Sequence, residues 1–340
     1  MTEGKCCVMV SSAASNTGMH IVERLIKHKD KFSLVGSIFS KDSDNQGAAL
    51  RSYQDALKTV AVDGMDITTL NAAFKQHQPD VLVLIPVGHA NRITIAKNYL
   101  SAAKQANVKN ILLVSTSMAP KKDYLFAEQF AEIEEALKAM SSSSSSNIQT
   151  SSSDEAAPVW TVIRPCFYME NLLLYDKDIQ QGVLKLPTGE GKFAPVATAD
   201  VGKFVEAILL SWQNHHRKAY ELTGPLALSG AEMASAASKA LNRPIRFENI
   251  SDDEAAALLN SRGIPEGDLP GWRQFYMLVR EGKKSDVLVD DFERIAKCKP
   301  ETLERFWLQH ASRLTPQSAS MASMPGTMSS QYCASSNPCA

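Results

Sequence analysis

The chain has 340 residues, a formal net charge of −1 and 44% hydrophobic residues. This length allows one large or two modest domains with a sizeable core. The near-neutral charge, without a dense block of Lys and Arg, argues against a direct nucleic-acid partner and against a membrane-binding surface.

No apolar stretch approaches membrane-spanning length, and the first residues, MTEGKCC, contain an acid and no long apolar core. We therefore expect a cytoplasmic protein without a secretory signal. The six cysteines form no C-x-x-C pair and no Cys/His cluster with zinc spacing, so we expect no metal site. The adjacent His215 and His216 lie in a polar stretch, WQNHHRK, and we interpret them as a solvated loop pair.

Apolar runs and amphipathic segments alternate through the first half of the chain. Short apolar runs predict strands at residues 6–10, 32–39, 59–62, 81–85, 111–114 and 159–164. Helical spacing of apolar residues predicts helices at 19–28, 93–103 and 124–140, and a further helix that Asp66 caps. This alternation indicates a doubly wound parallel sheet with right-handed crossovers.

The turn at residues 11–18, between the first strand and the first helix, is where a dinucleotide pyrophosphate usually binds. A helix N-terminus there offers free N–H groups and the positive end of its dipole. The best-spaced fingerprint would have glycine at positions 12, 15 and 18, but the chain has Ser12, Ser15 and Gly18. A serine hydroxyl could donate to a phosphate or could fill the space that the phosphate needs. We predict that the phosphates contact Ser12, Ala13, Ser15, Asn16, Thr17 and Gly18.

Residues at the ends of the later strands are further candidates, because ligands bind at the carboxyl ends of parallel strands. Lys41 follows the second strand and favours NADP over NAD, unless it is a solvated surface lysine. Asp63, after the third strand, is either an adenine-side contact or a turn residue. We also place Pro86, which ends the fourth strand, at the cofactor. Ser115, after the fifth, is either a nicotinamide-side contact or a simple strand-end residue.

After Pro165 the regular alternation of strand and helix ends. We expect a short helix at 167–174, two strands at 183–186 and 192–196 that pair with each other, and a helix capped by Thr198. The pattern also predicts strands at 219–222 and 246–249, helices at 272–280 and 301–313, and capping boxes at Ser229 and Ser251.

These elements predict two regions. A Rossmann dinucleotide-binding domain comprises residues 1–165, and the chain returns to it at 197–223. A substrate subdomain comprises 166–196 and 224–314. A Ser-rich insert at 141–157 and a tail at 315–340 have the composition of disordered segments.

Several phrases, in this order, resemble the NmrA-like group of atypical short-chain dehydrogenases. They are SNTG at 15–18 with HIVERLI after it, DGMD at 63–66, ILLVSTS, AEIEEALK, RPCFYMENL at 164–172, TADVGKFV and YELTGPLALSGAEMA. The resemblance runs from about residue 8 to 314, apart from the Ser-rich insert. It implies an α/β fold, a Rossmann-type doubly wound parallel sheet with a smaller, mostly helical C-terminal substrate subdomain. Members of the group include NAD(P)H-dependent reductases of quinones, dyes and phenylpropanoids, and non-catalytic regulators that sense dinucleotides.

The chain departs from this group at the two serines of the first turn and at Phe130. Reductases of the group often have a lysine at that position, near the nicotinamide, but Phe130 also completes the apolar stripe of its helix. The Tyr-x-x-x-Lys pair of ordinary short-chain dehydrogenases is absent, so no proton donor and no catalytic residue is evident. With Phe130, we expect Tyr168, Met169 and Asn171 to line the substrate cleft.

Two functions follow as alternatives. The first is an NAD(P)H-dependent reductase of a small planar, quinone-type acceptor, with NADP preferred over NAD. The second is a regulator or binding module that contacts a protein partner. It either binds dinucleotide weakly or has lost the cofactor.

Overall fold

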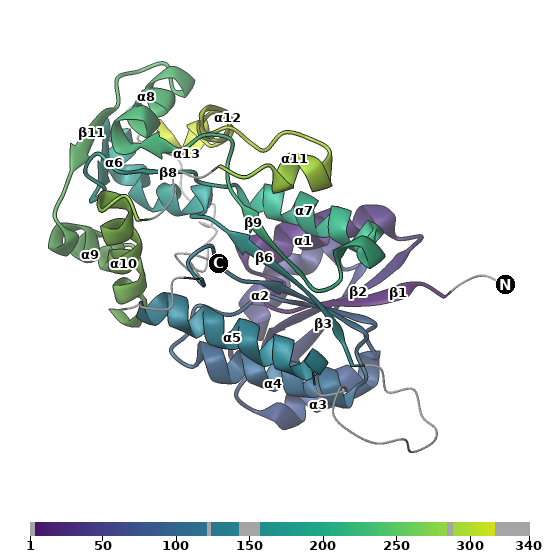
Figure 1. Ribbon diagram of the computed structural model, residues 1–340. Helices are drawn as coiled ribbons and strands as arrows, with labels where there is room; N and C mark the ends of the chain where they lie inside the picture. Colours follow the sequence, from purple (N-terminus) through teal and green to yellow (C-terminus); the bar gives the residue numbers. More distant parts are fainter. Residues whose placement is uncertain (1–3, 121–123, 143–156, 265, 284–287, 317–340) are drawn as a thin grey trace, which may run out of the picture.

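The computed structural model describes residues 4–120, 124–142, 157–264, 266–283 and 288–316 (Figure 1). Most of the predicted Ser-rich insert and nearly all of the predicted tail therefore lie outside the described residues. Among the described residues, no helix has both the length and the apolar character needed to cross a membrane.

Within the described residues, seven strands form one parallel sheet in the order β3-β2-β1-β4-β5-β6-β9. The strands of the chain are β1 Cys6–Val10, β2 Phe32–Phe39, β3 Leu57–Val62, β4 Val81–Leu84, β5 Asn110–Val114, β6 Val159–Pro165, β7 Val183–Leu186, β8 Lys192–Phe193, β9 Lys218–Leu222, β10 Leu228–Ser229 and β11 Arg246–Asn249. The chain builds outward from β1 to β3 and then crosses back to β4. Strand order therefore reverses between β1 and β4, the place where open α/β sheets bind ligands.

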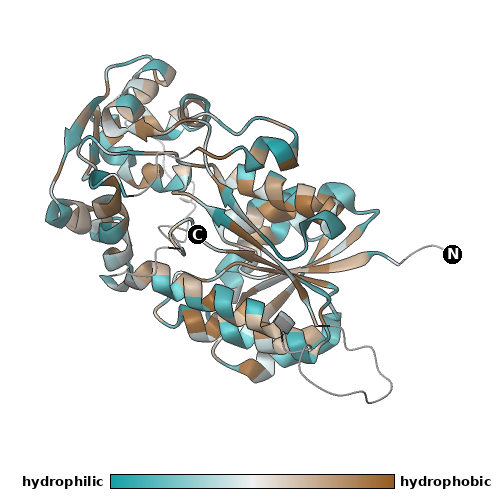
Figure 2. Cartoon of the chain, viewed as in Figure 1, coloured by the Kyte–Doolittle hydropathy of each residue, from teal (hydrophilic) through white to brown (hydrophobic). Residues whose placement is uncertain are grey.

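Helices cover both faces of this sheet (Figure 1). The α-helices of the described residues are α1 Asn16–Leu25, α2 Ser43–Leu50, α3 Ile67–His77, α4 Arg92–Gln105, α5 Leu125–Ser142, α6 Asp176–Gln180, α7 Thr198–Leu210, α8 Gly230–Ala240, α9 Asp252–Ser261, α10 Leu269–Arg280, α11 Asp291–Ala296, α12 Leu303–Gln309 and α13 Ala311–Leu314. One core cluster joins the sheet to α1 and α7, and a second joins it to α3, α4 and α5. Strand β4 is buried at every residue, which explains its uninterrupted apolar run, and the central strands are correspondingly brown in Figure 2.

The expected fold class is confirmed, but three expected details are wrong. Helix α1 begins at Asn16 rather than Met19, because Ser15 caps it. The sequence pattern missed α2, which has no apolar stripe and buries only Leu50. The helix expected at 301–313 is two helices, α12 and α13, with a break at His310.

The expected pairing of residues 183–186 with 192–196 is also wrong. Strand β7 pairs in parallel with β11, and β8 pairs antiparallel with β10. Each partner comes from a segment more than 30 residues away in sequence, so the local turn at 188–191 was a misleading signal. His215 is another correction, because it is buried and hydrogen-bonded to Ser211 and Tyr220 rather than solvated.

Helices α8, α9 and α10 lie beyond the carboxyl ends of the sheet strands, whereas α11 lies against α7 (Figure 1). Phe167, two residues after the end of β6, packs against α10. Its ring stacks on Phe275 at 4.7 Å between centroids and meets Trp272 edge-on at 5.6 Å. The segment that follows Phe167 is therefore held between the sheet and α10.

Candidate functional site

The turn after β1 takes the conformation that its missing glycine would take. Ser12 has φ 48°, in the left-handed region that favours glycine. Its hydroxyl donates to the carbonyl of Ile85 at 3.1 Å, and its own carbonyl accepts the N–H of Ser15 at 2.9 Å. A left-handed serine costs about 1–2 kcal/mol, and the hydrogen bond to Ile85 offsets part of that cost. The hydroxyl is directed at the end of β4.

The second serine needs no glycine conformation. Ser15 has φ −70° and ψ 160°, which any residue adopts, and it is the N-cap of α1. Its hydroxyl oxygen accepts the N–H of Gly18 at 3.0 Å. The N–H groups of Asn16 and Thr17 belong to the first turn of α1, where a helix provides no internal acceptor. Both residues line the cavity described below.

Gly18 is the one fingerprint glycine that remains, and its place is filled by backbone. A Cβ at Gly18 would lie 2.3 Å from the carbonyl oxygen of Ser12 and 2.8 Å from the Cα of Ala13. A Cβ at Gly36 would likewise lie 2.8 Å from that of Ala13. The turn thus keeps the tight approach of strand and helix that a pyrophosphate cradle requires, so these residues fit a dinucleotide.

A cavity of about 530 Å³ lies along the carboxyl ends of β1 to β4, a size typical of small-molecule sites. Five segments line it: the β1–α1 turn, residues 39–46 after β2, residues 62–65 after β3, residues 85–95 after β4, and Tyr168, Glu170 and Asn171 after β6. The cavity therefore crosses the point where strand order reverses and extends toward the C-terminal region.

The structure brings nine of the fourteen predicted site residues together around this cavity. They are Ser12, Ser15, Asn16, Thr17, Lys41, Asp63, Pro86, Tyr168 and Asn171. The other five, Ala13, Gly18, Ser115, Phe130 and Met169, are not among its lining residues. The first two shape the turn, as described above. Met169 is buried, and its N–H donates to Val196 at 2.9 Å.

Ser115 lies within a charged cluster rather than at the cavity. Its hydroxyl donates to Glu134 at 2.7 Å, and Arg164 donates to the same carboxylate at 2.9 and 2.7 Å. Burial alone would raise the pKa of Glu134, but hydrogen bonds from Arg164, Lys138 and Ser115 outweigh burial and lower it. The cluster ties α5 to the ends of β5 and β6.

Phe130 is fully buried, which corrects its expected place in the cleft. The guanidinium of Arg92 lies 5.2 Å from its ring centroid and 5.0 Å from that of Phe126. The same buried guanidinium donates to the carbonyl of Val87 at 2.8 Å and to Gln129 at 2.6 Å. Arg92 therefore fixes the loop after β4, one wall of the cavity, against α5.

The end of the cavity near β2 and β3 carries Lys41 and Asp63. Lys41 is exposed. Asp63 accepts the N–H of Met65 at 2.9 Å and also lines the cavity, so it is a turn residue as well as a candidate contact. Gln46, which the sequence pattern missed, accepts the N–H of Phe39 at 3.0 Å and holds the end of β2.

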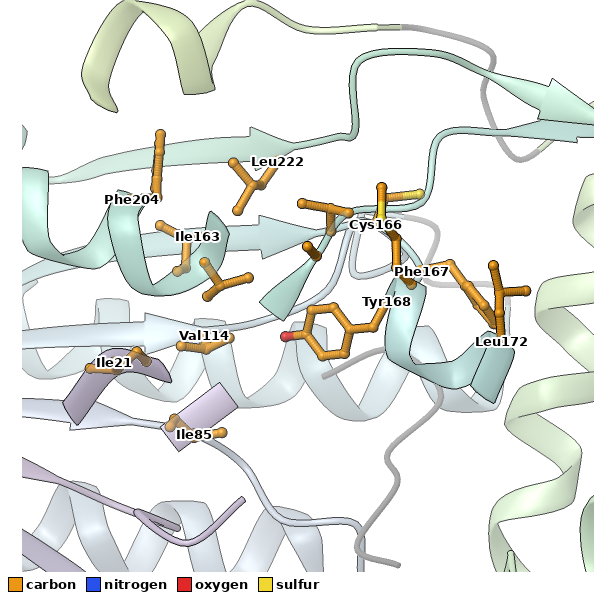
Figure 3. Close-up of a cluster of buried hydrophobic side chains, with 14 of the residues drawn as sticks. Ile21, Ile85, Val114, Ile163, Cys166, Phe167, Tyr168, Leu172, Phe204 and Leu222 are labelled. Atoms are coloured by element: carbon orange, nitrogen blue, oxygen red, sulfur yellow. The ribbon is translucent and has the colours of Figure 1, made fainter. Parts of the chain in front are cut away.

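The opposite end carries Tyr168, Glu170 and Asn171. In Figure 3 the Tyr168 hydroxyl points from the segment after β6 toward Val114 and Ile85, at the ends of β5 and β4. The chain of this segment is held by an isolated bridge between Tyr168 and Val196. Tyr168 and Asn171 are both nearly fully buried.

Glu170 also lines the cavity, although the sequence pattern did not single it out. Its carboxylate accepts the N–H of Thr198 at 3.0 and 3.1 Å and the Thr198 hydroxyl at 2.7 Å. Thr198 was expected to cap α7, but it is the first residue of the helix and Ala197 is the N-cap. The side-chain acceptor at this helix start is Glu170. Burial raises the pKa of Glu170, and the hydrogen bonds from Thr198 and the charge of His20 oppose that rise without cancelling it.

Residues 4–269 match the model of the NmrA-like family. The chain belongs to the NmrA-like family. The resemblance seen in the sequence is thereby confirmed, as is the Rossmann-type architecture.

Three proteins are similar to this chain over most of their own length. The NAD(P)H azoreductase of Xenophilus azovorans is 28% identical over 258 residues, which are 75% of this chain and 83% of that protein. The Escherichia coli NADPH-dependent quinone oxidoreductase QOR2, solved with NADPH, superposes with a TM-score of 0.71 at 22% identity and covers 89% of this chain and 99% of its own. NmrA itself, a negative transcriptional regulator solved with NAD, superposes with a TM-score of 0.68 at 13% identity, covering 90% of this chain and 95% of its own.

Proposed function

We propose that this chain is a cytoplasmic NADPH-dependent reductase of a small planar acceptor, such as a quinone. One observation carries the proposal: a single cavity runs from Lys41, past the open N-terminus of α1, to Tyr168 and Asn171. In order along this path, a lysine, the free N–H groups of a helix N-terminus, and a tyrosine with an amide match the adenosine end, the pyrophosphate and the nicotinamide of a dinucleotide. The similarity to an azoreductase and to a quinone oxidoreductase supports the choice of acceptor.

The binding roles follow from this path. The N–H groups of Asn16 and Thr17 face the pyrophosphate, where the helix dipole favours negative charge. Lys41 meets the 2′-phosphate and thereby prefers NADP over NAD, and Asp63 lies on the adenine side. Tyr168 and Asn171 flank the nicotinamide and the acceptor. When bound, the reduced cofactor supplies a hydride, and the chain binds, orients and excludes water.

Calorimetric titration with NADPH, NADH and their oxidised forms tests the binding roles. We expect micromolar binding with a preference for NADPH. Lys41→Ala should weaken NADPH binding roughly three- to tenfold, since one exposed charge pair contributes about 1 kcal/mol, and should leave NADH binding unchanged. An equal loss for both cofactors would contradict the assignment of Lys41.

A second function, a regulator that binds the dinucleotide without turnover, has one structural observation in its favour. Ser115, which was expected on the nicotinamide side, and Phe130, which was expected in the substrate cleft, are buried and absent from the lining of the cavity. The similarity to NmrA also fits this alternative. NADPH oxidation with a panel of quinones and azo dyes separates the two functions, because a regulator would bind NADPH and give no acceptor-dependent loss of absorbance.

A further inference from the structure

Reduction of a quinone needs a proton as well as a hydride. The hydride brings two electrons and one hydrogen, and the second hydroxyl of the hydroquinone requires one more proton. The usual Tyr-x-x-x-Lys donor is absent from the chain. A general acid that reaches the acceptor must therefore come from another part of the cavity wall.

The titratable side chains that line the cavity are unevenly placed. Lys41, Asp42 and Asp63 follow β2 and β3, at the adenosine end, and His89 lies in the loop after β4. Tyr168 and Glu170 follow β6, at the end where the nicotinamide and the acceptor would lie. A carboxyl group gives up its proton far more readily than a phenol does, which makes Glu170 the stronger acid of these two.

We propose that Glu170 is the general acid that protonates the acceptor oxygen during reduction. This proposal rests on the proposed reductase function. In the step, the O–H bond of the Glu170 carboxyl breaks and its proton forms the new O–H bond of the hydroquinone. The carboxylate that remains takes up one proton from the solution, which is the proton that the overall reaction consumes, so the group is restored after each turnover.

The surroundings of Glu170 serve both of its protonation states. Partial burial favours the neutral carboxyl and thereby raises the pKa of Glu170, so the proton is retained to higher pH than on an exposed glutamate. After the proton leaves, the N–H and hydroxyl of Thr198 donate to the carboxylate at 2.7 to 3.1 Å. The N-terminal end of the α7 dipole also favours the anion. From α1, the charge of His20 acts in the same direction.

Glu170→Gln and Thr198→Val form the test. Glutamine keeps an oxygen that can accept from Thr198, so α7 stays capped, but it has no transferable proton. We expect kcat with a quinone to fall on the order of 100-fold, while the affinity for NADPH stays unchanged. In the wild type, kcat should fall as pH rises through the pKa of Glu170, and Glu170→Gln should lose that dependence.

Thr198→Val removes one donor that lowers the pKa of Glu170 and keeps the backbone N–H. We expect the decline of kcat to move to higher pH. Thr188→Val is the matched control, because Thr188 is equally buried and its hydroxyl has no hydrogen-bond partner among the residues that the structure describes. It should leave the pH profile unchanged.

A second readout needs no cofactor. In protein labelled with ¹³C at the glutamate carboxyls, the Glu170 resonance is the one that Glu170→Gln deletes. It should titrate above the usual glutamate range, and higher still in Thr198→Val. His89 lines the opposite wall after β4 and is the competing donor, so His89→Gln is measured alongside.

The outcomes of these experiments distinguish the role of Glu170 from the reductase function itself. Turnover by Glu170→Gln within about threefold of wild type at every pH, or loss of the pH dependence in His89→Gln instead, would overturn the role of Glu170 and leave the reductase function standing. Bound NADPH with no turnover by the wild type would overturn both. A normal or lowered pKa for Glu170 would overturn the general-acid role alone.

Discussion

Ser12 and Gly18 show that two fingerprint positions are replaceable to different degrees. Position 12 needs a left-handed backbone, which a serine adopts at moderate cost while its hydroxyl bonds to Ile85. Position 18 needs the absence of a side chain, because backbone atoms of Ser12 and Ala13 occupy the space. A strained torsion costs a limited free energy, whereas a steric overlap with backbone forces the turn to move.

We therefore predict that Gly18→Ala lowers the free energy of unfolding by about 3 kcal/mol and weakens NADPH binding. The matched control is Gly47→Ala in α2, where a Cβ would meet only the tip of Ile38 at 4.0 Å. That change should raise the free energy of unfolding by about 0.5–1 kcal/mol. Urea denaturation of both variants checks the pair, and similar stabilities would contradict the steric assignment.

At the scale of elements, the Glu134 cluster joins α5 to β5 and β6. The lowered pKa of the Glu134 carboxyl means that the folded state binds a proton there more weakly than the unfolded chain does. The resulting stability is present above the unfolded pKa and is lost as pH falls through the folded pKa. Removing the charge leaves Arg164 without its main partner.

Glu134→Gln should accordingly lower the free energy of unfolding by about 3 kcal/mol at pH 7, and the difference from wild type should shrink below pH about 4. Glu132→Gln, on the same helix, is the control. Its exposed pair with Lys97 should contribute less than about 1 kcal/mol. Denaturation at the two pH values is the measurement, and a pH-independent loss would contradict the electrostatic explanation.

The elements also show how far sequence patterns reach. The sheet strands and the residues at their ends were predictable, because apolar runs and the polar residues after them are local signals. The contacts of Ser115 with Glu134 and of Glu170 with Thr198 were not, because their partners lie 19 and 28 residues away and no spacing rule links them. The pairing of β7 with β11 failed for the same reason.

For the molecule as a whole, the cavity exists only when the β1–α1 turn, the ends of β2 to β4 and the segment after β6 come together. The unfolded chain therefore has no such site, and a bound ligand stabilises the folded state alone. NADPH at one hundred times its dissociation constant should add about 2.7 kcal/mol to the free energy of unfolding. At about 2.1 cal/mol/K of unfolding entropy per residue, this corresponds to a rise in Tm of roughly 4 °C for a protein of this size.

Calorimetric melts across a range of NADPH concentrations measure this rise. Thr17→Glu should abolish it, because the new carboxylate would repel the pyrophosphate at the N-terminus of α1. A variant that folds and keeps the full rise in Tm would show that the dinucleotide binds elsewhere.

The position of β9 has a consequence for synthesis on the ribosome. This strand completes the sheet beside β6, yet 52 residues separate Pro165, the last of β6, from Lys218, the first of β9. Until residue 222 has left the exit tunnel, the edge of β6 has no neighbour on that side, and β7 awaits β11 for longer still. Exposed strand edges invite intermolecular pairing. The nascent chain thus passes through a stage that favours association with chaperones, and a messenger truncated between these two strands would encode an aggregation-prone product.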